Sequence, residues 1–253
     1  AAIGFLPTYD SIGIIATTLM ILVRMLQGLS MGGALTGSIS FVIEHAEKEQ
    51  RGFLGSISMS SICIGILLGS TVSFVTKSLM SDEAFMSYGW RIPFIVGIFI
   101  FFAGVYVKKY TSETPLFEDA RYRGEIAKSP LKKTFANHKM DMLISIMINA
   151  TGSIIFYFEA IYLTSYLKIG RGFDDLEVTN LVNFCYVIMA VITLLSGWLS
   201  DRIGRRKIFL FNFVCIIMTF PILLEMLENG NFAAAATAQV IIAIYAATYI
   251  GPE

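Results

Sequence analysis

The sequence has few charged residues. Only 15% of its 253 residues are Asp, Glu, Lys or Arg, whereas a soluble domain has about 25%. Hydrophobic residues make up 55% of the chain, and the mean hydropathy is +0.69. Nineteen basic and nineteen acidic residues cancel, so the net charge is zero. The composition excludes an ordinary soluble domain, and the zero net charge gives no support to nucleic-acid binding.

Signatures of metal binding, disulfide bonding and catalysis are also lacking. Cys63, Cys185 and Cys215 are widely spaced within apolar runs, which is typical of small packing residues. His45 and His138 have no metal-ligand spacing, and no phosphate-binding loop occurs. We therefore expect neither a cofactor nor an enzyme. The chain begins with Ala and shows no signal peptide, so we expect it to be a piece of a longer protein.

Long apolar runs dominate what is present. A membrane-spanning helix needs about 20 predominantly apolar residues. Seven stretches meet or approach that length: Ser11–Ile43, Phe53–Val75, Ile92–Val107, Met142–Tyr166, Val178–Ser200, Ile208–Leu227 and Phe232–Ile250. The third is short and could be extended by the preceding Gly-Trp-Arg. Because backbone polar groups in lipid must pair within the segment, the sequence predicts an all-α, polytopic membrane protein.

Positive charge is concentrated in alternate loops. Residues 44–52, 108–141 and 201–207 contain fourteen of the nineteen Lys and Arg residues. Cytoplasmic loops carry such an excess, so we expect these three loops to be cytoplasmic and the chain to lie in the cell (inner) membrane. Residues 108–141 form a long polar segment, and we interpret them as a cytoplasmic linker between an incomplete N-terminal helix bundle, 1–107, and an incomplete C-terminal bundle, 142–253.

Polar residues inside the apolar runs are candidates for a transport pathway, because they are costly in lipid. Arg24 lies well inside the first span, and Gln27 follows almost one helical turn later. Arg24 could line a pathway or form a structural ion pair. Asn149 and Glu159 lie in the fourth span. Glu159 has tyrosines around it, so it could be interfacial; if it is buried, it could carry protons.

The loop Gly-Trp-Leu-Ser-Asp-Arg-Ile-Gly-Arg-Arg-Lys, residues 197–207, resembles the G-x-x-x-D-R-x-G-R-R-K signature of the major facilitator superfamily. Three further motifs resemble that family: Arg24, Gln27 and Gly28 match R-x-x-Q-G; Glu44, Arg51 and Gly52 match E-x(6)-R-G; and Glu113–Asp119 resembles one end of a sixth span. The residues that match the loop signature are Gly197, Asp201, Arg202, Gly204, Arg205, Arg206 and Lys207.

The resemblance implies a partial major facilitator fold, with about seven full spans of an expected twelve. It points to the metabolite:proton symporter branch, which includes proline/betaine and 2-oxoglutarate transporters. It therefore implies alternating-access transport of a small carboxylate or zwitterion, with protons as the coupling ion. In that branch an acidic residue follows the paired glycines, whereas Ala34 follows Gly33 here. The alternative is a truncated remnant that does not transport.

The resemblance also implies a cytoplasmic gate. Asp201 would pair with neighbouring arginines or with a nearby helix N-terminus. The arginines of its loop would pair with carboxylates such as Glu113. The predicted gate residues are Glu44, Arg51, Glu113, Gly197, Asp201, Arg202, Gly204, Arg205, Arg206 and Lys207. The predicted substrate and proton pathway contains Arg24, Gln27, Asn149 and Glu159.

Overall fold

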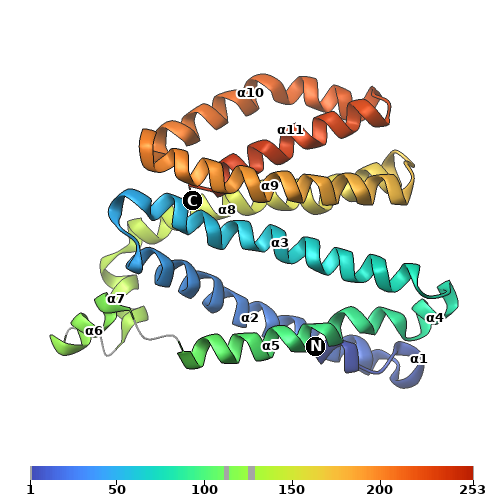
Figure 1. Cartoon of the computed structure of the whole chain (residues 1–253), viewed down its shortest axis with the longest axis horizontal. Coiled ribbons are helices and arrows are strands. Elements are labelled where there is room, and N and C mark those ends of the chain that lie inside the picture. Colours follow the sequence, from blue (N-terminus) through green and yellow to red (C-terminus); the bar gives the residue numbers. More distant parts are fainter. Residues whose placement is uncertain (1, 111–113, 125–128, 253) are drawn as a thin grey trace. The chain divides into compact units, whose positions relative to one another are not determined.

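The computed structural model of the chain describes residues 2–110, 114–124 and 129–252. Regular structure within these ranges is entirely helical (Figure 1). The first part contains η1 (Ala2–Phe5), α1 (Tyr9–Ile12), α2 (Ile14–His45), η2 (Lys48–Gln50), α3 (Arg51–Ser78), α4 (Asp82–Ser87), η3 (Gly89–Arg91) and α5 (Ile92–Tyr110). The second contains α6 (Pro115–Tyr122), α7 (Pro130–Asn137), α8 (Lys139–Tyr157), η4 (Phe158–Leu163), η5 (Tyr166–Gly170), α9 (Asp175–Ile203), α10 (Arg205–Asn229) and α11 (Phe232–Ile250).

Seven helical segments within the described residues are long and apolar enough to cross a membrane. They coincide with the seven predicted apolar stretches, so that prediction is confirmed. The third is lengthened by Gly-Trp-Arg, as expected, and runs from Gly89 to Val107. The fourth continues from α8 through the π-helical segments η4 and η5 to Gly170. Of the predicted linker 108–141, the described residues include the short helices α6 and α7.

The chain forms two compact units. Unit 1 contains residues 1–41 and 68–115, and unit 2 contains residues 42–67 and 116–253. The first part of α3, through Leu67, therefore belongs to the same unit as the C-terminal helices α8–α11. The predicted bundles 1–107 and 142–253, joined by 108–141, concern the arrangement of a whole transporter and stay a prediction.

In unit 1, a short N-terminal segment is held against the start of α5. The Arg91 guanidinium donates to the carbonyl oxygens of Ser87, at 3.0 Å, and Leu6, at 3.2 Å. It also lies 4.6 Å from the centre of the Trp90 ring. A Cβ atom on Gly4 would come within 3.1 Å of the Arg91 carbonyl oxygen, so the two segments are in close contact.

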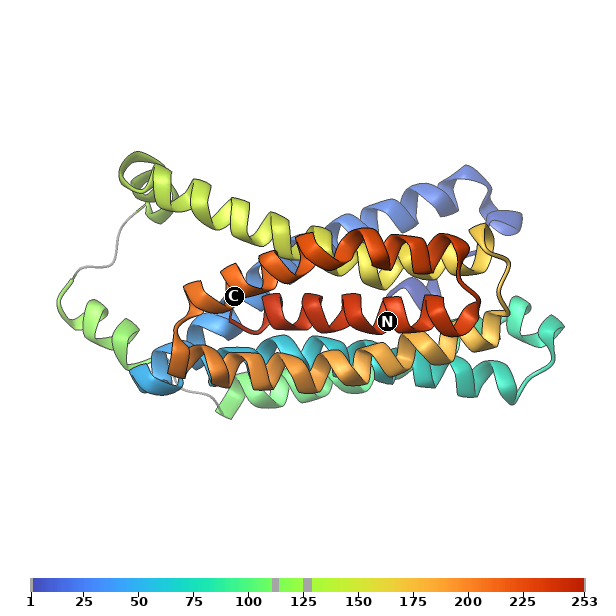
Figure 2. The same ribbon diagram turned by 90° about the horizontal axis from the view of Figure 1, so that it is seen from above.

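In unit 2, α11 lies between α9 and α10 (Figures 1 and 2). Its sequence begins Phe-Ala-Ala-Ala-Ala-Thr-Ala, and small residues allow helices to approach closely in a membrane. Five alanines of α11 are completely buried: Ala235, Ala238, Ala243, Ala246 and Ala247. They belong to one apolar core to which α3, η4, η5, α9 and α10 also contribute.

Local signals fix the ends of these helices. The Asp174 side chain caps α9 by accepting from the Leu176 and Glu177 amides, and Asn231 caps α11 by accepting from the Ala234 amide. These are preferred N-cap residues. The turn from α9 to α10 consists of Gly204, whose φ of 92° is readily adopted only by glycine. The loop signature thus spans the end of α9, this turn and the start of α10.

Candidate functional site

The Asp201 carboxylate caps the N-terminus of α3. Its Oδ1 accepts from the Gly52 amide at 2.7 Å, and its Oδ2 accepts from the Phe53 amide at 2.8 Å. The first amides of a helix have no partner within the helix and carry partial positive charge. Of the two kinds of partner predicted for Asp201, the structure therefore shows the helix N-terminus. We call these two hydrogen bonds the clasp.

Two glycines make the clasp possible. A Cβ atom on Gly52 would lie 2.6 Å from Asp201 Oδ1 and 2.7 Å from the Gly197 carbonyl oxygen. A Cβ atom on Gly197 would lie 2.6 Å from the Gly52 carbonyl oxygen. No side chain larger than hydrogen fits at either position while the two backbones are this close. The glycine of the loop signature and the glycine of the 44–52 loop are thus steric partners.

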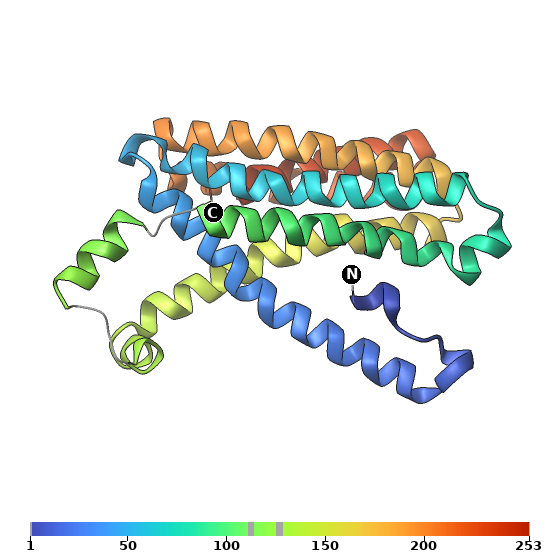
Figure 3. The same cartoon turned by 60° about the horizontal axis from the view of Figure 1, so that its bottom comes forward.

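The two helices α3 and α9 lie side by side (Figure 3). We call the contact between residues 52–63 of α3 and residues 185–201 of α9 the seam. On α3, Gly52, Ser56 and Ser60 recur every fourth residue and are all buried, so they share one helix face. The Ser60 hydroxyl donates to the Ala190 carbonyl oxygen at 2.8 Å. Small side chains therefore define the seam from the clasp into the middle of the helices.

The charged residues beside the clasp are more exposed. Arg202 is stacked over the Trp198 ring at 3.9 Å from its centre, an attractive arrangement for a guanidinium. Glu49, Gln50 and Phe53 join Trp198, Asp201 and Arg202 around a pocket of about 400 Å³. Arg51 and Glu44 are half-buried nearby in the chain, while Arg205, Arg206 and Lys207 are exposed in the first turn of α10. Glu113 lies outside the described residues.

The predicted pathway residues fall in both units. In unit 1, Arg24 Nη1 donates to Gln27 Oε1 at 3.3 Å, and both side chains are exposed. The structure therefore brings this pair together on one face of α2. In unit 2, Asn149 is also exposed and its amide donates to the Ser145 carbonyl oxygen at 3.0 Å. None of these three is buried within its unit.

Glu159 is different, because its side chain is 0% exposed. It lies in the π-helical segment η4, a form that is often found at functional sites. Of the two positions considered from sequence, the structure shows the buried one. Beside it lies Gln239 of α11, which is also 0% exposed. Sequence reasoning missed Gln239, although it is the only amide side chain in the apolar span Phe232–Ile250.

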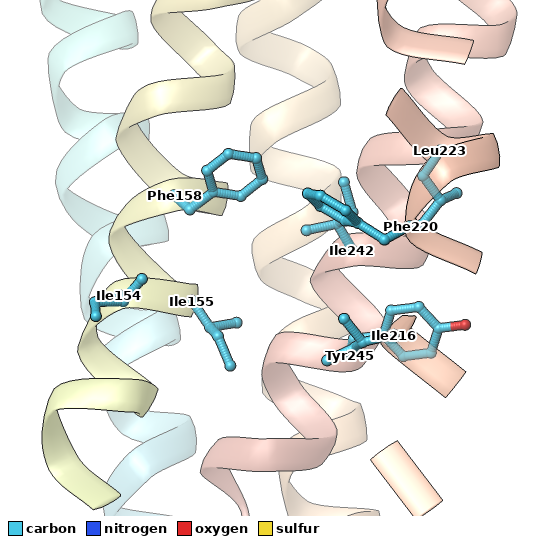
Figure 4. A pocket seen from close by; sticks show the side chains of 8 residues that line it. All are labelled: Ile154, Ile155, Phe158, Ile216, Phe220, Leu223, Ile242 and Tyr245. Atoms are coloured by element: carbon cyan, nitrogen blue, oxygen red, sulfur yellow. The ribbon is translucent and has the colours of Figure 1, made fainter. Parts of the chain in front are cut away.

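An apolar hollow lies next to this region, between α8, η4, α10 and α11. Figure 4 shows Ile154, Ile155, Phe158, Ile216, Phe220, Leu223, Ile242 and Tyr245 around it. Its volume is about 230 Å³. The Tyr245 hydroxyl already accepts a hydrogen bond from Thr219. This lining suits hydrocarbon rather than a charged metabolite, so we do not place the substrate there.

The fold and these sites define a multi-pass helical membrane protein. The family model of the Major Facilitator Superfamily matches residues 1–252. The chain therefore belongs to the major facilitator superfamily, whose members are transporters rather than enzymes.

Several bacterial transporters are similar in sequence to most of this chain. The proline/betaine transporter of Escherichia coli (strain K12) is 30% identical over 240 residues, which are 90% of this chain and 47% of that protein. The glycine betaine/proline/ectoine/pipecolic acid transporter OusA of Dickeya dadantii (strain 3937) is 30% identical over 214 residues, 81% of this chain and 42% of that protein. The chain spans about half the length of the curated relatives it matches. No solved structure matches it.

Proposed function

We propose that the chain acts in a secondary active transporter for a small carboxylate or zwitterion, of the proline/betaine or 2-oxoglutarate type. Transport would use alternating access and proton symport. The observation that carries the proposal is the clasp between Asp201 and the α3 N-terminus. Support for the substrate class comes from the names of the relatives and from Arg24, a cation inside a membrane span.

The clasp has the properties of a gate. It joins a helix of the predicted N-terminal bundle, α3, to a helix of the predicted C-terminal bundle, α9. Its strength comes from two short hydrogen bonds at one point, so a small displacement breaks both. Once separated, the α3 amides and Asp201 can both be hydrated at the predicted cytoplasmic side. An interface with two discrete arrangements is what alternating access requires.

Arg24 and Gln27 supply a matching substrate site. A guanidinium binds a carboxylate through two parallel hydrogen bonds, and the neighbouring amide of Gln27 can add another. All of the proposed substrates carry a carboxylate. The hydrogen bond between Arg24 and Gln27 in this structure would orient the guanidinium before the substrate arrives.

The test is uptake by the complete protein in proteoliposomes, driven by an imposed inward proton gradient. Labelled proline, betaine and 2-oxoglutarate are the substrates. We expect one of them to accumulate, and we expect a protonophore to abolish the accumulation. Failure to accumulate any of the three, with correct insertion, would contradict the proposed substrate class.

Arg24→Ala is the variant that tests the substrate site. We expect it to abolish uptake, because it removes the proposed partner of the substrate carboxylate, and to leave insertion unchanged, because the guanidinium is exposed and its hydrogen bond to Gln27 lies within α2. Lys77→Ala, which removes an exposed cation at the end of α3, is the control and should transport normally. Normal uptake by Arg24→Ala would exclude its role in the pathway.

A further inference from the structure

Glu159 and Gln239 form a polar pair inside an otherwise apolar core. Glu159 comes from η4 and Gln239 from α11, and neither side chain is exposed at all. Around them are buried apolar residues of the same core, including Ala160, Leu163 and Met189. Nothing in the proposed clasp or substrate site uses this pair, so its burial needs a separate explanation.

The hydrogen-bonding groups of the pair are unsatisfied. Both carboxyl oxygens of Glu159 and both polar atoms of the Gln239 amide are buried without a hydrogen-bond partner among the described residues. Most buried polar groups in proteins do have a partner. A carboxylate ion in this position would be very costly. A proton removes the charge, and the resulting O–H group can donate a hydrogen bond to the Gln239 carbonyl oxygen after a small side-chain rotation.

No compensating cation lies beside the pair among the residues that the structure describes. The titratable groups that face Glu159 are Cys63 from α3 and Cys185 and Tyr186 from α9, all neutral when protonated. From α10, Leu223 and Leu227 complete the core. In the part of the chain that the structure describes, the carboxyl group therefore has neutral neighbours on every helix that packs around it.

We propose that Glu159, paired with Gln239 and buried beside Cys63 of α3, is the proton-binding site of the transport cycle. The inference rests on the proposed function, because it assigns the coupling proton to one carboxyl group. An O–H bond forms at the Glu159 carboxylate as an O–H bond of a hydronium ion breaks and leaves water behind. Release of the proton to water reverses this step, and no other bond forms or breaks.

The position of Cys63 links the proton site to the clasp. Cys63 lies on the same seam as Gly52, Ser56 and Ser60, so the helix that places Cys63 near Glu159 is the helix whose N-terminus Asp201 caps. When the clasp opens and α3 moves away from α9, water reaches the pair and the proton can leave. The proton can be exchanged only in the open arrangement, as symport requires. Ala34 leaves no acid after the paired glycines, and Glu159 supplies one on another helix.

The experiment uses the complete protein in proteoliposomes and compares Glu159→Gln with two other variants. Gln239→Leu removes only the partner. Glu225→Gln makes the same acid-to-amide change at an exposed position of α10 and is the matched control. Two quantities are measured: the carboxylic-acid C=O stretching band by infrared difference spectroscopy at neutral pH, and uptake with and without a proton gradient.

We expect the wild type and Glu225→Gln to show the band of a buried protonated acid and to accumulate substrate. Glu159→Gln should lose the band and gradient-driven accumulation but retain substrate exchange at equal pH. Gln239→Leu should shift the band, because the hydrogen bond to the acid is lost. If Glu159→Gln keeps the carboxylic-acid band and still accumulates substrate as the wild type does, Glu159 is not the proton-binding site.

The two proposals fail in different ways. If the complete wild-type protein transports none of the three substrates, the proposed function is wrong, while the infrared band still decides whether Glu159 holds a proton. If the wild type transports and Glu159→Gln loses exchange as well as accumulation, with normal insertion, Glu159 acts in substrate passage and the proton assignment is wrong.

Discussion

Two acidic side chains, Asp201 and Glu159, lie beside opposite ends of the seam between α3 and α9. They differ in their burial and in their hydrogen bonds. Asp201, at the end of the seam, accepts hydrogen bonds from the Gly52 and Phe53 amides. Glu159, near Cys63 and Cys185 at the other end of the seam, is more deeply buried and accepts none among the described residues. A satisfied polar group stabilises the arrangement that satisfies it, whereas an unsatisfied one destabilises it. We therefore infer that Asp201 holds the seam closed, and our proposal for Glu159 makes the closure of the seam depend on a proton.

The largest loss of stability is expected when Gly52, which allows the clasp to form, is replaced. Gly52→Ala should destabilise the closed arrangement by about 1–3 kcal/mol, because the added methyl group meets the Gly197 carbonyl oxygen, which cannot move alone. The measurement is thermal unfolding in detergent together with uptake. Gly55→Ala, three residues later on the same helix, is the control, since its Cβ atom would meet only Ile43 at 3.8 Å. Equal losses in both variants would argue against a specific contact at Gly52.

The second largest loss of stability is expected when Asp201, the carboxylate of the clasp, is replaced. Asp201→Asn should cost about 1–2 kcal/mol, because the amide offers one oxygen for two backbone N–H groups and turns its own NH2 group toward one of them. Unfolding in detergent would measure the loss. If Asp201→Asn is as stable as the wild type and transports normally, the two hydrogen bonds do not hold the gate.

A smaller effect is expected from the hydroxyl in the middle of the seam. Ser60→Ala removes one hydrogen bond to the Ala190 carbonyl oxygen and should cost about 0.5–1 kcal/mol. Ser61→Ala, whose hydroxyl bonds only within its own helix to Ser58, serves as the control. A loss in Ser60→Ala larger than in Asp201→Asn would move the main closing contact from the end of the seam to its middle.

The smallest effect on stability is expected at Glu159. Glu159→Gln should change the unfolding free energy by less than about 0.5 kcal/mol, because a neutral amide of similar shape replaces the proposed neutral acid and can still hydrogen-bond to the Gln239 side chain. The same chemical change thus has opposite consequences at the two acids: it weakens the fold at Asp201 and spares it at Glu159. Destabilisation of Glu159→Gln by as much as Asp201→Asn would show that Glu159 is a structural residue.

Sequence periodicity and charge predicted most of the fold. Each of the seven helices was visible as an apolar run, because length and hydropathy alone determine whether a helix can span lipid. The π-helical segments η4 and η5 were not predicted, since nothing in the composition of residues 158–170 distinguishes them from α-helix. Helix packing was equally hidden: Ser56 and Ser60 form a seam only because α9 lies beside them.

Only part of the candidate site could be predicted, because motif spacing can be read from the sequence whereas helix packing cannot. Asp201 and Gly197 belong to a motif, and motif spacing is a property of the sequence. Gln239 belongs to no motif, and it matters because the fold places it beside an acid 80 positions earlier in the chain. The sequence marks Gln239 only as a polar residue that stands alone in an apolar span. That feature does not predict which residue lies beside it.

The most direct test of the account is a distance measurement across the clasp by electron spin resonance. Spin labels at exposed positions 48, before α3, and 207, after α9, would be placed in the complete protein in lipid. We predict two distances, with the longer one favoured when Asp201 is replaced by Ala and the populations shifted by substrate and pH. A single distance, unchanged by substrate, pH or Asp201→Ala, would contradict a gate at the clasp.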